Sequence, residues 1–194
     1  MSTKTDKRRA DLRASLIDIA ETHIIAGGLG SLKARALATE AGCAVGAIYN
    51  VVGDLHDLTL MVNARTFKRM GAKIAANTHG DTPTERLISM SHAYLDFADA
   101  NQNAWRALFD LDRPEGATAP NWYLTEMGQL FAIIDGPIKA VFTEMTTDDH
   151  ALMTRALFSS VHGIVTLGLD PASAGVPLPQ LRRMIALVLT AITH

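Results

Sequence analysis

The 194-residue chain has one cysteine, few aromatic residues and no long apolar run. A single cysteine, Cys43, excludes a disulfide framework within the chain and agrees with a reducing compartment. No stretch approaches the roughly 18 consecutive apolar residues that a membrane-spanning helix requires. The polar N-terminus also lacks an apolar signal region. We therefore expect a cytoplasmic protein that makes no contact with membranes.

Charge is distributed unevenly along the sequence. Residues 1–73 carry eleven Lys and Arg against seven Asp and Glu, a net charge of +4. Residues 74–194 carry seven against thirteen, a net charge of −6. This asymmetry places any nucleic-acid contact in the first third of the chain.

Strand signals are nearly absent, and apolar residues recur at helical spacing from end to end. We predict an all-α protein of about nine helices, with a proline-induced kink or break at Gly136-Pro137. Residues 113–120 and 170–175 are predicted loops. The predicted helices are one that ends at residue 27, then 33–41, 45–52, 54–77, one that opens at 82–83, then 101–112, 121–145, 148–169 and 179–193.

The spacing within residues 33–52 is typical of a helix-turn-helix. Ala38 supplies a small residue where two helices cross, Gly42 supplies the turn, and Ile48 anchors the second helix in the core. The same spacing also fits a plain helical bundle in which Gly42 only ends a helix. In the first interpretation, Tyr49 offers a hydroxyl to a DNA phosphate and Asn50 an amide to a phosphate or a base edge.

The run from Gly28 to Asn50 resembles the DNA-binding signature of the TetR family of transcriptional regulators. The shared features are a glycine before the second helix, an apolar-Ala pair within it, Ala-Gly at the turn and Gly-x-x-Tyr in the recognition helix. The resemblance covers residues 9–70 and implies a DNA-binding domain there, followed by an α-helical effector-binding and dimerisation domain over 71–194. The candidate DNA-contacting residues are Lys33, Arg35, Ala44, Val45, Gly46, Ala47, Tyr49 and Asn50.

The chain departs from the family pattern at the starts of two helices and after Tyr49. Lys33 replaces the usual Ser or Thr and Ala44 the usual Ser, while Val52 and Leu55 replace an aromatic residue and a lysine. A lysine cannot cap a helix as a hydroxyl does, but it can bind phosphate directly. The basic residues of the N-terminal arm can compensate electrostatically for the missing lysine; they are Lys4, Lys7, Arg8 and Arg9.

The second domain contains a shorter similarity and a set of candidate pocket residues. Residues 156–163 look like the signature of a TetR subgroup, Trp-x3-His-Gly, with Phe158 in the tryptophan position. Most aromatic and methionine side chains of this region are expected in the core, yet their polar tips also suit an apolar pocket with a few orienting groups. The candidate effector-pocket residues are Met90, Tyr94, Phe97, Trp105, Phe109, Trp122, Tyr123, Met127 and His162.

Motifs of enzymes and metal sites are weak or missing. Gly28-x-Gly30 lacks the third glycine and the preceding strand of a dinucleotide fingerprint. The histidines lack metal-ligand spacing, and Asp148-Asp149-His150 is better explained as a solvated helix start. No Gly-x-Ser-x-Gly elbow occurs. We therefore expect no catalytic activity, no cofactor and no metal.

The last helix carries two apolar stripes, whereas the surface helix of a monomer needs only one. A last helix buried wholly within its own chain would also carry two stripes and is the alternative to an interface. One stripe is Leu181, Ile185, Val188 and Ile192, and the other is Met184, Leu187 and Ala191. We therefore expect a homodimer formed through the last two helices. The predicted function is that of a transcriptional repressor that a small apolar effector releases from double-stranded operator DNA. The alternative is an all-α ligand-binding or enzymatic dimer whose head has lost DNA binding, which Ala44 and Leu55 favour.

Overall fold

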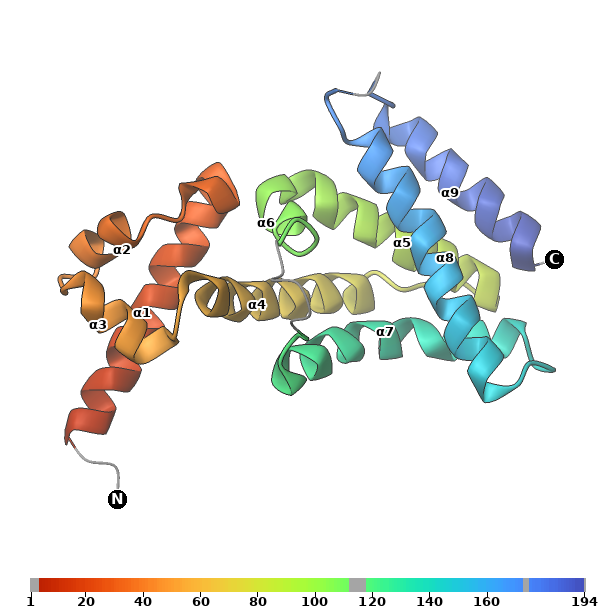
Figure 1. Ribbon diagram of the computed structural model, residues 1–194. Coiled ribbons are helices and arrows are strands. Elements are labelled where there is room, and N and C mark those ends of the chain that lie inside the picture. The colour runs from red at the N-terminus through yellow and green to blue at the C-terminus, as the bar shows by residue number, and fades with distance from the viewer. Residues whose placement is uncertain (1–3, 112–117, 173–174, 194) are drawn as a thin grey trace. The chain divides into compact units, whose positions relative to one another are not determined.

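The computed structural model describes residues 4–111, 118–172 and 175–193, and throughout these residues the chain contains helices and no strand (Figure 1). The prediction of an all-α fold with about nine helices is confirmed. The α-helices of the described residues are α1 (Lys4–Gly27), α2 (Ala34–Glu40), α3 (Val45–Val52), α4 (Leu55–Ala76), α5 (Pro83–Ala100), α6 (Gln102–Arg106), α7 (Asn121–Val141), α8 (Thr147–Gly168) and α9 (Leu178–Thr193).

Contacts divide the chain into two compact units. The head unit comprises residues 1–67 and 101–124, and the body unit comprises residues 68–100 and 125–194. Helix α6 therefore packs with the head, although it follows α5 of the body in sequence. The functional boundary that we predict at residue 70 remains a prediction.

The head unit is built on the apolar face of α1. Leu16, Ala20 and Ile24 of α1 are completely buried because they recur every four residues and so share one side of the helix. Burial of each of the two larger side chains, Leu16 and Ile24, stabilises the fold by about 1.5–3 kcal/mol. The other helices of the head contribute the remaining core residues, which include Leu37, Ala38, Ile48, Val52, Leu58, Val62, Ala104 and Ala107.

The turn between α2 and α3 depends on Gly42. Its φ of +62° lies in the left-handed region, which glycine adopts without a steric penalty. This conformation lets the Cys43 amide donate to the Ala38 carbonyl at 2.9 Å, so α2 ends and the chain reverses within a few residues. Gly42, which the sequence pattern assigns to the turn, therefore forms the turn.

The body unit contains a core shared by α5, α8 and α9, and Figure 1 shows α8 and α9 side by side. Gly168 allows these two helices to approach closely, because a Cβ added there would lie 2.2 Å from Leu181 Cδ2. Helix α5 begins with a reciprocal capping box, in which the Glu85 amide donates to Thr82 Oγ1 and the Thr82 amide donates to Glu85 Oε2. The buried core residues of these three helices include Leu87, Met90, Tyr94, Leu157, Val161, Val165, Leu181, Ile185 and Leu189.

Two predicted details of the helices are wrong. The first is a break at Pro137: helix α7 continues through this proline as one element, with Ile138 fully buried after it and an ion pair between Lys139 and Asp135 that spans it. A kink at Pro137 stays a prediction. Helix α6 stops at Arg106, so Phe109 lies beyond it and not on a helix. Parts of the predicted loops, 113–117 and 173–174, lie outside the described residues. Among the described helices, none has both the length and the apolar character that crossing a bilayer requires.

Candidate nucleic-acid interface

Helix α3 separates a buried side from an exposed side. Ile48 is completely buried and Val52 almost so, because they lie four residues apart and face α1 and α2. Asn50 lies on the opposite side and Tyr49 on the flank between the two, and both are exposed, Tyr49 by 44% of its surface. An exposed tyrosine beside an amide is a surface suited to phosphate and base-edge contacts.

The first turn of α3 is small and open. Ala44, Val45 and Gly46 are exposed, and Ala47 is half-buried. A Cβ added at Gly46 would meet no atom within 4 Å, so the space beside Gly46 is open. Short side chains at this position let a DNA backbone or groove edge approach the helix closely.

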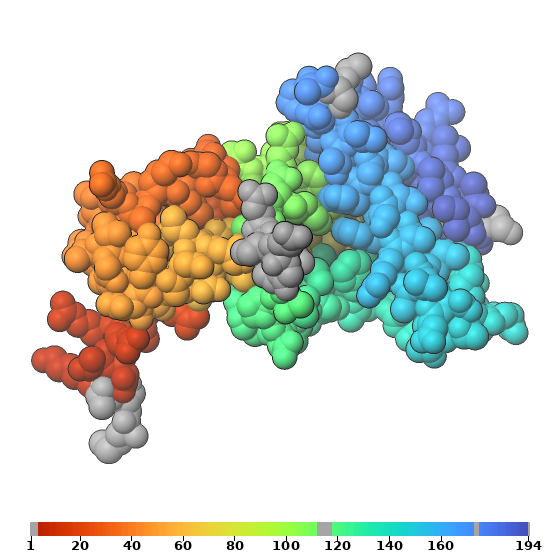
Figure 2. Space-filling model, in the orientation of Figure 1, coloured from red at the N-terminus to blue at the C-terminus, as the bar shows by residue number. Residues whose placement is uncertain are grey.

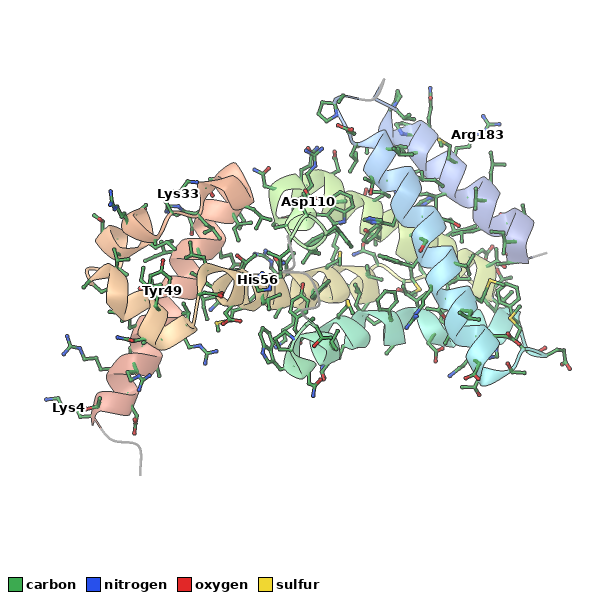
Figure 3. All side chains as sticks on the ribbon, in the orientation of Figure 1. Lys4, Lys33, Tyr49, His56, Asp110 and Arg183 are labelled. Carbon is green, nitrogen blue, oxygen red and sulfur yellow. The ribbon has the colours of Figure 1, made fainter. Side chains whose placement is uncertain are left out.

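The helix starts near this surface lack side-chain caps. Lys33 is the N-cap of α2 and Ala44 the N-cap of α3, and neither side chain accepts a hydrogen bond from the first turn. Lys33 and Arg35 are both exposed, and Figure 3 shows Lys33 at the start of α2. The uncapped amides and the two cations together favour a negatively charged partner.

The first turns of α1 complete the surface. Figure 2 shows them (red) projecting from the helix-turn-helix (orange), and their basic residues are all exposed. The Arg9 guanidinium donates to the Asn50 carbonyl at 2.9 Å and so joins α1 to α3. Arg8 and Arg9 line a hollow of about 700 Å³ together with residues of the turn and α3, including Gly42, Cys43, Ala44, Ala47 and Asn50. No sequence pattern signalled the Arg9–Asn50 contact, because the two residues are 41 positions apart.

Two other groups of ionisable side chains in the head pair with one another. Arg65 of α4 donates to Asp18 at 2.6 Å and Glu21 at 3.0 Å, and its hydrogen bond with Asp18 is the main reason that the pKa of the guanidinium is raised. His23 lies 2.7 Å from Glu40 and so connects α1 with α2. These contacts fix the helices that support α3, whereas the cations of the arm and of α2 remain at the surface.

The body unit contains a small apolar cavity of about 40 Å³. Of the predicted pocket residues, Met90 and Tyr94 line this cavity. His162 does not line it but lies next to it, because its Nδ1 is 2.8 Å from Tyr94 Oη in a hydrogen bond. Met127 lines a separate groove, and Phe97 is buried. The cavity lining consists of Ile74, Leu87, Met90, Ser91, Tyr94, Leu130, Ile134, Leu157, Phe158, Val161 and Leu189.

His162 occupies a partly dry position. Burial lowers the pKa of its imidazole, so the ring is held neutral at pH 7. One nitrogen interacts with the Tyr94 hydroxyl and the other, Nε2, lies 3.3 Å from Thr166 Oγ1. A neutral imidazole can satisfy both contacts because it donates from one nitrogen and accepts at the other.

The remaining candidate pocket residues belong to the head unit and line neither the cavity nor the groove. Trp105 packs edge-on against Phe109 with ring centroids 5.4 Å apart. Tyr123 packs against Trp122 at 5.7 Å, again edge-on. These four residues form ordinary aromatic packing within the head. The sequence alone does not distinguish them from the aromatic residues that pack in the body.

Residues 87–192, more than half of the chain, match the family of tetracyclin repressor-like C-terminal domains. The chain belongs to the TetR family of transcriptional regulators. A curated relative, an uncharacterised HTH-type transcriptional regulator of Mycobacterium tuberculosis, is 27% identical over 169 residues, which cover 86% of this chain and 74% of the relative. The TetR-family match and this relative make the chain a DNA-binding transcriptional regulator.

Solved structures of similar fold agree with the TetR-family assignment. A protein of unknown function from Rhodococcus sp. RHA1 is 20% identical with a TM-score of 0.73, and the match covers 92% of this chain and 93% of that one. The TetR family transcriptional regulator PfmR from Thermus thermophilus is 14% identical with a TM-score of 0.62, over 90% and 97% of the two chains. At these identities the similarity shows the fold alone.

Proposed function

We propose that this protein is a homodimeric, cytoplasmic repressor that binds operator DNA through α3 and leaves it when a small apolar effector binds in the body unit. The observation that carries the proposal is the division of α3 into a buried and an exposed side. Ile48 and Val52 secure the helix, while Tyr49, Asn50 and the open first turn face outward. This is the arrangement that a recognition helix needs to enter a major groove.

Each exposed residue has a proposed role. Lys33 and Arg35 bind phosphates at the edge of the groove, and Tyr49 donates its hydroxyl to another phosphate. The short side chains of residues 44–47 allow close approach, and Asn50 reads a phosphate or a base edge. The Arg9–Asn50 contact supports this role, because it holds the C-terminal half of α3 against α1.

The dimer interface that we propose consists of the outward faces of α8 and α9. Leu152 and Leu167 of α8 are 63% and 67% exposed in the single chain, and Met184 and Leu187 of α9 are 41% and 60% exposed. Apolar side chains of this size, gathered on two neighbouring helices, mark an interaction surface. A symmetry-related copy would bury them in a four-helix, isologous interface.

The effector part of the proposal relies on the body cavity and the polar pair beside it. Release from DNA requires only that the effector bind the DNA-free state more tightly than the DNA-bound state. Two recognition helices bind successive major grooves about 34–36 Å apart, so a state with another separation binds the operator less well.

The decisive experiment is a selection of genomic DNA fragments on the immobilised full-length protein, followed by fluorescence anisotropy on the enriched sequence. We expect a pseudo-palindrome whose half-sites are centred about one helical turn, or a multiple of it, apart. Asn50→Ala should reduce the preference for the enriched sequence over random DNA more than it reduces binding to random DNA. Enrichment of no sequence, combined with no retention of DNA at low salt, would instead favour a ligand-binding dimer.

A further inference from the structure

Two hollows of the body unit meet at Phe158. The apolar cavity holds about 40 Å³, whereas ligand sites commonly measure about 300–1,000 Å³. A groove of about 650 Å³ lies between α7 and α8. Of the described residues, Phe158 alone lines both hollows, so its ring forms a wall between them. The groove is lined by Met127, Gly128, Phe131, Ala132, Asp135, Ala151, Thr154, Arg155, Phe158 and Ser159.

Three aromatic contacts hold the Phe158 ring. The ring stacks on His162 with centroids 5.5 Å apart and an interplanar angle of 14°. Phe131 and Tyr94 meet it edge-on, at 5.1 Å and 5.9 Å. Phe158 is half-buried and lines both hollows, so a change of its side-chain rotamer is the motion that would join cavity and groove.

The joined space is apolar at its inner end. The side chains that line the cavity are apolar apart from the Ser91 and Tyr94 hydroxyls, and the Tyr94 hydroxyl is already hydrogen-bonded to His162. An apolar group placed there gains the free energy of leaving water without having to supply hydrogen bonds. The inner end therefore selects an alkyl or aryl group.

The groove end carries an uncompensated positive charge. The Asp135 carboxylate is 2.6 Å from Lys139 and so has its own cation. Arg155 is exposed and has no ion-pair partner among residues 4–111, 118–172 and 175–193. A guanidinium binds a carboxylate through two parallel hydrogen bonds, which makes an anionic head group the matching ligand for this end.

We propose that the effector is an apolar monocarboxylate, with its tail in the joined cavity, its carboxylate on Arg155 and the Phe158 ring turned aside. This inference rests on the proposed effector-responsive function and names the ligand class. Around α8, Phe158 points about 120° and Arg155 about 60° away from Leu152, which belongs to the proposed dimer interface, so the groove opens beside that interface and its Phe158 end points away from it. Alkyl and aryl acids share the required chemistry, and the experiment separates them.

The experiment is calorimetric titration of the full-length protein with octanoate, 2-naphthoate and the uncharged octan-1-ol. We expect at least one of the two acids to bind. Binding of octanoate indicates a site for an alkyl tail, and binding of 2-naphthoate indicates a site for an aryl tail. Arg155→Gln should weaken binding of the acid at least about tenfold and leave octan-1-ol unchanged, because only the acid loses a charge-assisted hydrogen bond. The matched control is Arg183→Gln, an exposed arginine of α9 outside the groove (Figure 3), which should change neither affinity.

Two substitutions that change the size of the Phe158 side chain test its proposed role as the wall between cavity and groove. Phe158→Leu keeps an apolar side chain and should retain acid binding, whereas the larger Phe158→Trp should block the passage and reduce binding at least about tenfold. Circular dichroism verifies that each variant is folded. The inference is overturned if neither acid binds at millimolar concentration, or if Arg155→Gln binds the acid as tightly as the parent protein. These titrations contain no DNA, so their failure leaves the DNA-binding part of the proposed function standing.

Discussion

Replacing Lys33 by Ala measures how much DNA affinity arises from phosphate binding at the start of α2. Lys33 is exposed, caps no amide and has no charged partner among the described residues. The substitution therefore removes a cation and leaves no buried group unpaired. Its effect on folding should be small, so a change in affinity reports on DNA contact.

The expected loss of DNA affinity in Lys33→Ala follows from the symmetry of the proposed dimer. The substitution occurs in both protomers, so two phosphate contacts are lost. At about 1 kcal/mol per contact, the affinity should fall about 30-fold at low salt. Each contact contributes about −0.9 to the slope of log K against log salt, so the slope should become shallower by about 1.8. Between about 50 and 200 mM salt, the affinity difference between parent and variant should shrink about twelvefold.

The assay is fluorescence anisotropy of a labelled, mixed-sequence duplex, titrated at several salt concentrations. Phosphate contacts act on any sequence, so the operator need not be known. Lys73→Ala, which removes an exposed cation of α4 in the body unit, is the charge-matched control and should leave the slope unchanged. Identical slopes for the parent protein and Lys33→Ala would refute the placement of the DNA surface.

Four further measurements test other parts of the structure. Tyr49→Phe removes only the exposed hydroxyl and should weaken binding to operator and mixed-sequence DNA by a similar factor, measured by anisotropy. Leu187→Glu charges an exposed residue of α9 and should give a folded monomer by light scattering; a dimer at micromolar concentration would contradict the interface. Gly168→Ala should lower the free energy of unfolding by about 1–3 kcal/mol in urea, whereas Gly128→Ala, where an added Cβ meets nothing within 4 Å, should not. The backbone amides of Thr82 and Asp81 donate to the Glu85 carboxylate and lower the pKa of this carboxyl. The ionised Glu85 therefore stabilises the fold fully above the ordinary pKa of glutamate, and this stabilisation is lost as the pH falls through the lowered pKa. The difference in melting temperature between the parent protein and Glu85→Gln should follow the same pH dependence.

The helices of the head could be predicted because local rules determine them. A glycine in the left-handed region ends α2, and apolar residues four positions apart bury one side of α3. Both rules act within a few residues and leave a direct trace in the sequence. For the same reason, the exposed positions of α3 follow from the buried ones.

The grouping of aromatic residues could not be predicted from the sequence. Periodicity identifies the face of a helix that is buried but not the element against which it packs. Trp105 and Trp122 have the same character as Tyr94, yet they pack in the head while Tyr94 lines the cavity of the body. The Arg9–Asn50 bond and the continuity of α7 through Pro137 likewise depend on tertiary contacts, which override local preference.

Helix α8 contributes different residues to the core, the groove and the proposed interface, so substitutions can test the proposals one at a time. At about 100° per residue, Leu157 and Val161 face the core, Phe158 faces the groove, Leu152 and Leu167 face outward, and Arg155 lies between Phe158 and Leu152. A substitution in one of these sites therefore need not disrupt another. Leu187→Glu, on the neighbouring α9, should abolish the dimer and keep acid binding, whereas Arg155→Gln should keep the dimer and weaken acid binding. Because the same helix lines the groove and supplies half of the proposed interface, a ligand that repositions α8 can alter the spacing of the two recognition helices. An acid that binds with equal affinity in the presence and absence of operator DNA would show that this connection is missing.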